Sequence, residues 1–306
     1  MNRDPVANTD SLSFIIPAYN ESETIAGVVS ELRHLYPESE IIVIDDGSTD
    51  DTGRVAESAG AKVITHPYNI GNGAAVKSGI RVATGDILVF MDADCQHRPE
   101  NVQKLIEHTL RYDMVVGARS NSDHASRFRA LANRIFNRFG SFVAKFKIMD
   151  LTSGFRAIKA GIAKQFIYLL PNTYSYPTTL TLSVLRSGLS VKYVPIEVAK
   201  RKKGKSNIKA YRDGVRFLMI IIKICTLYSP LRVFLPLSFT AFILGVIYYL
   251  YTFINAGRFT NMGALLFTTS LLIFLLGMVS EQICQMRFER SEQTRRRDDR
   301  NIVNDR

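Results

Sequence analysis

The strongest constraint on the fold comes from two long uncharged stretches near the C-terminus. Between Arg232 and Glu281 the one charged residue is Arg258, which separates the apolar runs 233–257 and 259–280. Each run reaches the roughly 20 residues that an α-helix needs to cross a bilayer. The alternative is a pair of buried core helices, but core helices rarely run uncharged for so long. We therefore expect two transmembrane helices.

The segment between the two runs is very short, so the spans should form a hairpin whose outer ends lie on one side of the membrane. Basic residues are dense before the first span and after the second. By the positive-inside rule, these ends face the cytoplasm. We also expect no N-terminal signal peptide, because the first residues contain no apolar stretch.

These patterns predict four regions in a protein of the cell (inner or plasma) membrane. They are a cytoplasmic domain (1–210), an amphipathic interface helix (211–230), the transmembrane hairpin (231–284) and a charged cytoplasmic tail (285–306). The net charge of +11 would suit nucleic acid, but an anionic membrane surface or a phosphorylated substrate fits a hairpin better. We therefore expect no nucleic-acid partner. The three cysteines are scattered and predict neither a disulfide framework nor a zinc site.

The N-terminal region alternates short apolar runs with helical segments. Strands are expected at 12–17, 40–44, 61–66 and 86–94, with a helix at 22–34 capped by Asn20 or Ser22, a second helix from about 50, and a glycine-rich turn leading into a third. This alternation predicts an α/β fold with a mostly parallel sheet and helices on both faces. Strands buried on both sides are nearly continuously apolar, as these are.

Polar clusters follow three of the expected strands. They are Tyr19, Asn20 and Glu21; Asp45 and Asp46; and Asp92, Asp94 and Gln96. Ligands bind at the carboxyl ends of parallel strands, where all three clusters should lie.

Asp92 and Asp94 would repel each other unless a positive charge lies between them. An Asp-x-Asp loop can hold Mg²⁺ or Mn²⁺, which completes its shell with phosphate oxygens of a substrate. A solvated turn is the commoner explanation for an isolated Asp-x-Asp. Three polar clusters on one sheet edge favour the metal site.

Five motifs occur in a fixed order: FIIPAYNESETI, IIVIDDGSTDDT, GNGAAVKSGI, MDADCQH and DLTSGFRAIK. With them the chain resembles family 2 glycosyltransferases of GT-A fold. The closer likeness is to polyprenyl-phosphate glycosyltransferases, the group of dolichyl-phosphate mannose synthases and undecaprenyl-phosphate glucosyl- and aminosugar transferases. The resemblance covers about residues 10–210, and the hairpin is similar to that of two-span members. It implies a GT-A nucleotide-sugar-binding domain followed by a transmembrane hairpin.

The resemblance also implies roles on the donor side. The nucleotide-sugar pocket would include Pro17, Tyr19, Glu21, Ile44, Asp46, Asp92 and Ala93. Asp94 and Gln96, with Asp92 near, would hold the Mg²⁺ or Mn²⁺ that bridges the diphosphate. The basic stretch 200–209 would close over the donor, with Arg201 or Lys205 neutralising it; a solvated charge run or a membrane-surface patch is the alternative. Family members often carry a lysine where this chain has Asn72. The absence of that lysine argues against phosphate binding by a side chain of the glycine-rich turn.

A basic amphipathic helix is expected at 127–147. Arg127, Arg134, Arg138 and Lys145 share one face beside an apolar stripe. Such a helix either lies in a membrane interface or packs its stripe on the core. The similar segment 211–228, just before the first span, favours the interface, where the arginines could also hold an acceptor phosphate.

The resemblance places the acceptor site beside residues 150–159, with Ser153, Arg156 and Arg119 as phosphate contacts and Asp150 as either a base or an orienting group. A polyprenyl phosphate has a second pKa near 6, so it is largely dianionic at neutral pH and needs no strong base. A hydroxyl acceptor would need one. The role of Asp150 therefore separates two hypotheses.

The first hypothesis is a metal-dependent inverting glycosyltransferase that moves a sugar from a UDP- or GDP-linked donor to undecaprenyl or dolichyl phosphate, with Asp94 and Asp150 as catalytic residues. The second is a glycosyltransferase acting on a saccharide or lipid hydroxyl. A third is a non-catalytic, membrane-tethered nucleotide-binding protein, which has no need of a metal-diphosphate site. The oligomeric state stays open, with a homo-oligomer among the options.

Overall fold

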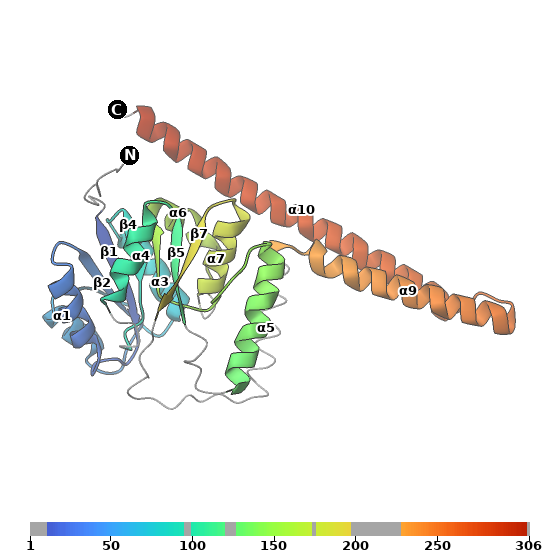
Figure 1. Ribbon diagram of the computed structural model, residues 1–306, viewed down its shortest axis with the longest axis horizontal. Helices are drawn as coiled ribbons and strands as arrows, with labels where there is room; N and C mark the ends of the chain where they lie inside the picture. Colours follow the sequence, from blue (N-terminus) through green and yellow to red (C-terminus); the bar gives the residue numbers. More distant parts are fainter. Residues whose placement is uncertain (1–10, 95–98, 120–126, 173–175, 197–227, 305–306) are drawn as a thin grey trace. The chain divides into compact units, whose positions relative to one another are not determined.

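The structure, a computed structural model, describes residues 11–94, 99–119, 127–172, 176–196 and 228–304. Contacts divide the chain into two compact units, Met1–Asn207 and Ile208–Arg306. The first is an α/β domain and the second contains a helical hairpin (Figure 1). Most of the predicted interface helix lies outside the described residues, so that prediction stays open.

A seven-stranded sheet forms the centre of the first unit, in the order β3-β2-β1-β4-β6-β5-β7. The β6 strand is antiparallel to β4 and β5, whereas the other pairings are parallel. The sheet is therefore mostly parallel, as the sequence predicts. The strands are β1 (Leu12–Ala18), β2 (Glu40–Asp45), β3 (Lys62–Thr65), β4 (Ile87–Phe90), β5 (Met114–Arg119), β6 (Arg156–Lys159) and β7 (Val191–Ile196).

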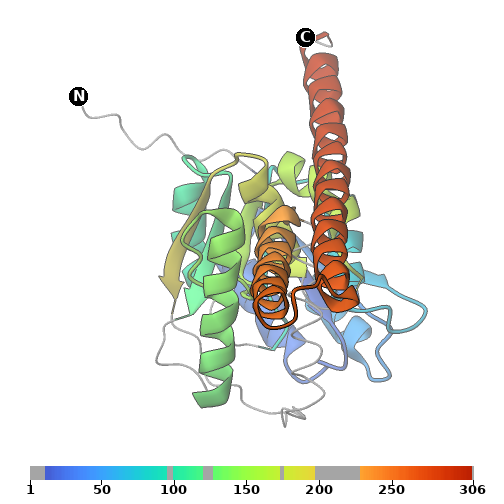
Figure 2. The same ribbon diagram turned by 90° about the vertical axis from the view of Figure 1, so that its right-hand side faces the viewer.

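Helices cover both faces of the sheet (Figures 1 and 2). On one face, Phe14 and Ile16 of β1 pack in a core with α1, α2 and α4. The neighbouring Ile15 is also fully buried but points to the other face, which α3, α6 and α7 cover. The helices are α1 (Ile25–Leu35), α2 (Thr52–Ser58), α3 (Asn72–Val82), α4 (Asn101–Thr109), α5 (Arg127–Ala144), α6 (Ala160–Phe166, followed by a 3₁₀ turn, Ile167–Leu169) and α7 (Tyr176–Arg186).

The first helix begins later than predicted. Its N-cap is Thr24, with no side-chain capping bond, so the prediction of Asn20 or Ser22 as the cap was wrong. Asn20 instead adopts a positive φ of 56°, and its side-chain Oδ1 accepts a hydrogen bond from Thr49 N at 2.8 Å. An asparagine tolerates this left-handed backbone because its side chain can bond locally. Here the bond joins the loops that follow β1 and β2.

The second unit contains a hairpin of α9 (Leu231–Ala256) and α10 (Asn261–Asn304). Both helices are long and apolar enough to cross a membrane, and only 11% and 17% of their most apolar windows are buried. That exposure argues against buried core helices. Between the helices, Ser238 and Ser270 each donate a side-chain hydrogen bond to the other's backbone oxygen at 2.9 Å. The predicted tail continues α10 as far as the structure describes it.

The close packing of α3 on the sheet yields a stability prediction. A Cβ atom at Gly79 would lie 2.9 Å from Ile44 Cδ1 and closer still to Ile15. Gly79→Ala should therefore lower the free energy of unfolding by about 1–3 kcal/mol through overpacking. Gly27→Ala is the matched control, because this glycine of α1 has no atom within 4 Å of its Cβ position; it should stabilise by up to about 1 kcal/mol. Denaturant unfolding of the purified protein measures both, and equal effects would contradict this packing.

Candidate active site

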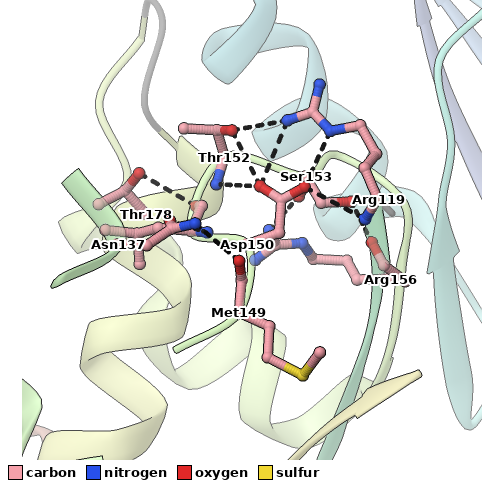
Figure 3. A network of polar contacts seen from close by, with 10 residues as sticks. Arg119, Asn137, Met149, Asp150, Thr152, Ser153, Arg156 and Thr178 are labelled. Atoms are coloured by element: carbon pink, nitrogen blue, oxygen red, sulfur yellow. Dashed lines mark hydrogen bonds and ion pairs between the residues drawn. The ribbon is translucent and has the colours of Figure 1, made fainter. Parts of the chain in front are cut away.

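The reversed direction of β6 decides which residues meet at the carboxyl edge of the sheet. Arg156, the first residue of β6, pairs with Phe90, the last residue of β4. An antiparallel strand begins where its neighbours end. The loop 150–155 before β6 therefore lies beside Arg119 at the end of β5 (Figure 3). Asp92, two residues beyond β4, belongs to the same edge.

Asp150 is held by a network of hydrogen bonds (Figure 3). Arg119 donates from Nε to Asp150 Oδ2 at 2.8 Å and from Nη2 to Oδ1 at 3.3 Å. Thr152 donates to Asp150 Oδ1 from its backbone N at 3.1 Å and from its hydroxyl at 3.0 Å. Arg119 Nη2 also donates to Thr152 Oγ1 at 2.7 Å. The bidentate pair fixes the orientation of the guanidinium group.

The pKa of Asp150 lies below its ordinary value. Burial opposes ionisation of this carboxyl group, but the hydrogen bond and charge of Arg119 and the two bonds from Thr152 outweigh it. Burial likewise opposes the charge of Arg119, yet its pKa is raised, because Asp150 and then Asp92 stabilise the cation. Asp150 is thus an ionised, weakly basic carboxylate. The geometry favours the orienting role over that of a general base.

The acidic pair lies next to this network. A Cβ atom at Gly154 would be 3.1 and 3.2 Å from the two carboxylate oxygens of Asp92, so the Asp92 carboxylate packs directly against this glycine. Asp92 and Asp94 are partly exposed, and Ala93 between them is buried. The charge of Asp92 acts on both Arg119 and Arg156. Neighbouring arginines therefore balance part of the negative charge at this edge.

The donor set fits a hard divalent cation. Among the described residues no group of three or more His, Cys, Asp or Glu side chains gathers as a metal site. Asp92 and Asp94 provide two carboxylates, and Gln96 lies outside the described residues. Mg²⁺ typically takes one or two carboxylates and completes its shell with substrate phosphates. Two partly exposed carboxylates are consistent with that pattern.

Ser153 and Arg156 are buried rather than presented to solvent. Arg156 is fully buried, and its Nη1 donates to Pro177 O at 2.8 Å and to Thr181 Oγ1 at 3.1 Å. Its Nη2 donates to Ser153 O, and Ser153 Oγ donates to Gly117 O at 2.6 Å. Burial lowers the pKa of Arg156. These contacts favour a structural role for both residues over direct contact with an acceptor phosphate.

The predicted donor residues lie at the ends of β1 and β2. Tyr19 is exposed, and Pro17 and Glu21 are partly exposed. Ile44 is fully buried and packs beneath α3, so it belongs to the core. Asp46 is also buried, and one of its hydrogen-bond partners is His66, which follows β3. His66 and Thr152 are not among the predicted site residues: His66 falls inside the expected strand 61–66, and Thr152 lies within the DLTSGFRAIK motif without a role assigned to it.

The α5 helix carries exposed basic and apolar side chains, but it ends at Ala144, so the prediction of a helix to 147 with Lys145 on its basic face was wrong: Lys145 has a φ of 52°. Arg134 and Arg138 are exposed, as are the apolar side chains of Ile135 and Phe142, whereas Phe136 is buried. Asn137, a further residue of α5, donates from Nδ2 to Met149 O at 2.6 Å and accepts from Leu151 N at 2.9 Å. The helix thus anchors the loop that carries Asp150. The side chain of Arg127, and all of Arg201 and Lys205, lie outside the described part of the structure.

The ion pair yields a second prediction. Asp150→Ala leaves the Arg119 cation without its partner and should lower the free energy of unfolding by roughly 1–3 kcal/mol, less than for a fully buried pair. The expected loss is smaller than for a fully buried pair because the Arg119 side chain is 31% exposed, so water can partly solvate the unpaired cation. Asp51→Asn, which removes the charge from the exposed pair with Arg54 but keeps a favourable N-cap residue for α2, should leave the unfolding midpoint nearly unchanged.

The pH dependence of this effect follows from the lowered pKa of Asp150. A carboxyl group whose pKa falls on folding stabilises fully above its unfolded value near 4, and this stabilisation is lost as pH falls through the folded value. The difference between wild type and Asp150→Ala should be constant between pH 5 and 7 and shrink below about pH 4. A difference that shrinks between pH 7 and 5 would contradict the assignment.

Comparison with known proteins agrees with this architecture. Residues 13–166 match glycosyl transferase family 2, and residues 229–286 match the GtrB C-terminal hairpin. The undecaprenyl-phosphate mannosyltransferase of Micrococcus luteus is 30% identical over 208 residues, which cover 63% of this chain and 86% of the relative. The polyprenol monophosphomannose synthase of Mycolicibacterium smegmatis is 29% identical over 219 residues, covering 66% and 83%.

A solved structure shows the same fold. It is glucosyl-3-phosphoglycerate synthase from Mycobacterium tuberculosis in complex with Mn²⁺, UDP and glucosyl-3-phosphoglycerate. The TM-score is 0.57 at 20% identity, over 74% of this chain and 85% of the other. The predicted GT-A type of α/β domain is thereby confirmed. With half of its length matched by the family domain and a hairpin of the GtrB type behind it, the chain belongs to glycosyl transferase family 2.

Proposed function

We propose that this protein is an inverting glycosyltransferase that moves a sugar from a nucleotide-sugar to a polyprenyl phosphate, giving a polyprenyl-phospho-sugar. The observation that carries the proposal is the acidic pair of Asp92 and Asp94 beside an arginine that a buried carboxylate holds in place. This edge belongs to a family 2 domain followed by an apolar hairpin. The relatives named above, which act on undecaprenyl phosphate or polyprenol by name, support the acceptor.

The donor binds at the carboxyl edge of β1, β2 and β4. Asp94, with Asp92 and Gln96, would hold Mg²⁺ or Mn²⁺, and the cation supplies positive charge to the departing nucleoside diphosphate. Tyr19 and Glu21 line the nucleotide side of this edge. Arg201 or Lys205 would add positive charge near the diphosphate. The nucleotide base, uracil or guanine, is for experiment to decide.

The acceptor chemistry matches the state of Asp150. A phosphate monoester has a second pKa near 6, so the polyprenyl phosphate arrives as a dianion and no proton has to be removed. Its oxygen attacks the anomeric carbon from the face opposite the diphosphate, the new C–O bond forms, and the nucleoside diphosphate leaves with the electron pair. A hydroxyl acceptor would require a base, and Asp150 is a weak one. The ion pair therefore favours the phosphate acceptor.

Arg119 is the side chain best placed to bind the acceptor phosphate. One edge of its guanidinium group is fixed by Asp150 and Thr152, while 31% of the side chain is exposed. Arg127, Arg134 and Arg138 of α5 are further candidates. The exposed aromatic and basic residues of α5 suit an anionic membrane interface, where such a lipid is found. We infer that the α/β domain lies on the cytoplasmic side.

The central reaction can be tested with the purified full-length protein in detergent. Undecaprenyl phosphate, Mg²⁺ or Mn²⁺ and labelled UDP-glucose, UDP-N-acetylglucosamine or GDP-mannose would be supplied in turn. We expect a labelled lipid with one donor, dependent on the metal. Asp94→Ala should abolish product while the protein stays folded and membrane-bound. Turnover at the wild-type rate in this variant would refute the metal assignment, and a labelled product only with hydroxyl acceptors would refute the lipid phosphate.

The pH dependence of turnover shows whether the group that must lose a proton is the lipid phosphate or Asp150. The rate should fall as pH drops through about 6, where the acceptor phosphate gains a proton. Asp150, with its lowered pKa, stays ionised across this range. Asp150→Asn should therefore turn over more slowly yet keep its inflection at the same pH. An inflection that disappears in this variant would identify Asp150 as a general base.

A further inference from the structure

A buried chain of hydrogen bonds joins the end of β2 to α3 through a histidine. His66 Nδ1 lies 2.7 Å from Asp46 Oδ1, and its Nε2 lies 2.9 Å from Ser78 Oγ. Asp46 is 3% exposed and His66 is 9% exposed. Because an ionised carboxylate only accepts hydrogen bonds, Nδ1 carries the proton and donates to Asp46. The bond between Nε2 and Ser78 Oγ ties the other side of the ring to α3.

Asp46 also holds the glycine-rich turn that precedes α3. Its Oδ1 accepts a second hydrogen bond from Ile70 N at 3.1 Å, and its Oδ2 accepts one from Gly71 N at 2.8 Å. Each carboxylate oxygen therefore has a protein donor. Gly71 has a φ of 124°, a conformation that glycine adopts without strain. The carboxylate of Asp46 thus sets where this turn lies.

The loops after β2 and β3 are packed against each other at the same place. A Cβ atom at Gly47 would lie 2.6 Å from Tyr68 Cα and 2.7 Å from Asn69 N. Two further backbone bonds continue the connection: His66 N donates to Asp45 O at 2.8 Å, and Asp46 N donates to Ala18 O at 2.9 Å. Hydrogen bonds and close packing therefore connect the ends of β1, β2 and β3, and His66 is a buried part of this connection.

We propose that His66 is a positioning residue for the nucleotide end of the donor site. This inference rests on the proposed function, in which the nucleotide-sugar binds at the ends of β1 and β2. His66 does not touch the donor; it holds the carboxylate of Asp46, which in turn places the turn at 70–71. Without the Nδ1 bond, the Asp46 carboxylate keeps its bonds to Ile70 N and Gly71 N but loses the one that ties it to the end of β3, so the carboxylate and the turn can shift together. The affinity for nucleotide should fall more than the rate of the chemical step.

Two substitutions at His66 test the hydrogen bonds of its two ring nitrogens one at a time. The amide nitrogen of asparagine stands as many bonds from Cα as Nδ1, so His66→Asn can still donate to Asp46. The amide nitrogen of glutamine matches Nε2, so His66→Gln keeps a group near Ser78 and loses the bond to Asp46. Ser78→Ala removes only the far bond. His34→Gln, at an exposed histidine of α1, is the control for the substitution itself.

The test is calorimetric binding of UDP and of GDP, each with Mg²⁺, to the full-length protein in detergent, beside the thermal midpoint of each variant. His66→Gln should weaken binding about tenfold, since a hydrogen bond to a charged group is lost, and His66→Asn should stay within about threefold of wild type. Donor KM in the lipid assay should rise in the same order, with kcat little changed.

Three results bear against the inference. Equal nucleotide affinity in wild type and His66→Gln, with only the midpoint lowered, would show a purely structural histidine and overturn this inference alone. Equal weakening in His66→Asn and His66→Gln would exclude the route through Asp46. Wild-type protein that binds neither UDP nor GDP would overturn the proposed function itself, and this inference with it.

Discussion

The negative charge of the two carboxylates that follow β4 is the constraint to which the rest of the site responds. Asp92 and Asp94 are separated by one residue and follow a buried strand, so positive charge placed near them favours their ionised forms. Arg119 and Arg156 provide part of this positive charge, since both interact electrostatically with Asp92. Arg119 reaches this edge as the last residue of β5, and Arg156 reaches it because β6 runs antiparallel to β4 and β5 and therefore begins there. The remaining negative charge is what a divalent cation would neutralise.

The aspartates of this edge have different roles, although the sequence alone does not distinguish them. Asp150 is buried and forms an ion pair with Arg119, so it orients the guanidinium group rather than accepting a proton. Asp46 is buried, and its carboxylate oxygens accept hydrogen bonds from His66 and from the backbone of the turn before α3. Asp92 and Asp94 stay partly exposed at the strand end. Burial and hydrogen bonding, rather than residue type, therefore distinguish the two positioning carboxylates, Asp46 and Asp150, from the partly exposed pair that we propose as metal ligands.

Local patterns predicted the parts of the fold that depend on neighbouring residues. The first four strands and the hairpin follow from runs of apolar residues, and the observed strands β1 to β4 agree with them. The reversal of β6 is not visible in such patterns, because it depends on pairing between residues far apart in the chain. For the same reason the sequence could not show that Arg119 and Asp150 pair, or that Arg156 is fully buried. Motif resemblance offered Arg156 as a phosphate contact, whereas backbone oxygens and Thr181 occupy it.

The central claim is that the acidic pair holds a divalent cation together with the donor diphosphate. The most direct measurement is Mn²⁺ binding to the purified full-length protein by electron paramagnetic resonance, with and without UDP or GDP, in wild type and Asp94→Ala. The account predicts Mn²⁺ binding that strengthens when the nucleotide is present and is lost in the variant. Equal Mn²⁺ binding by the two proteins, with or without nucleotide, would contradict it.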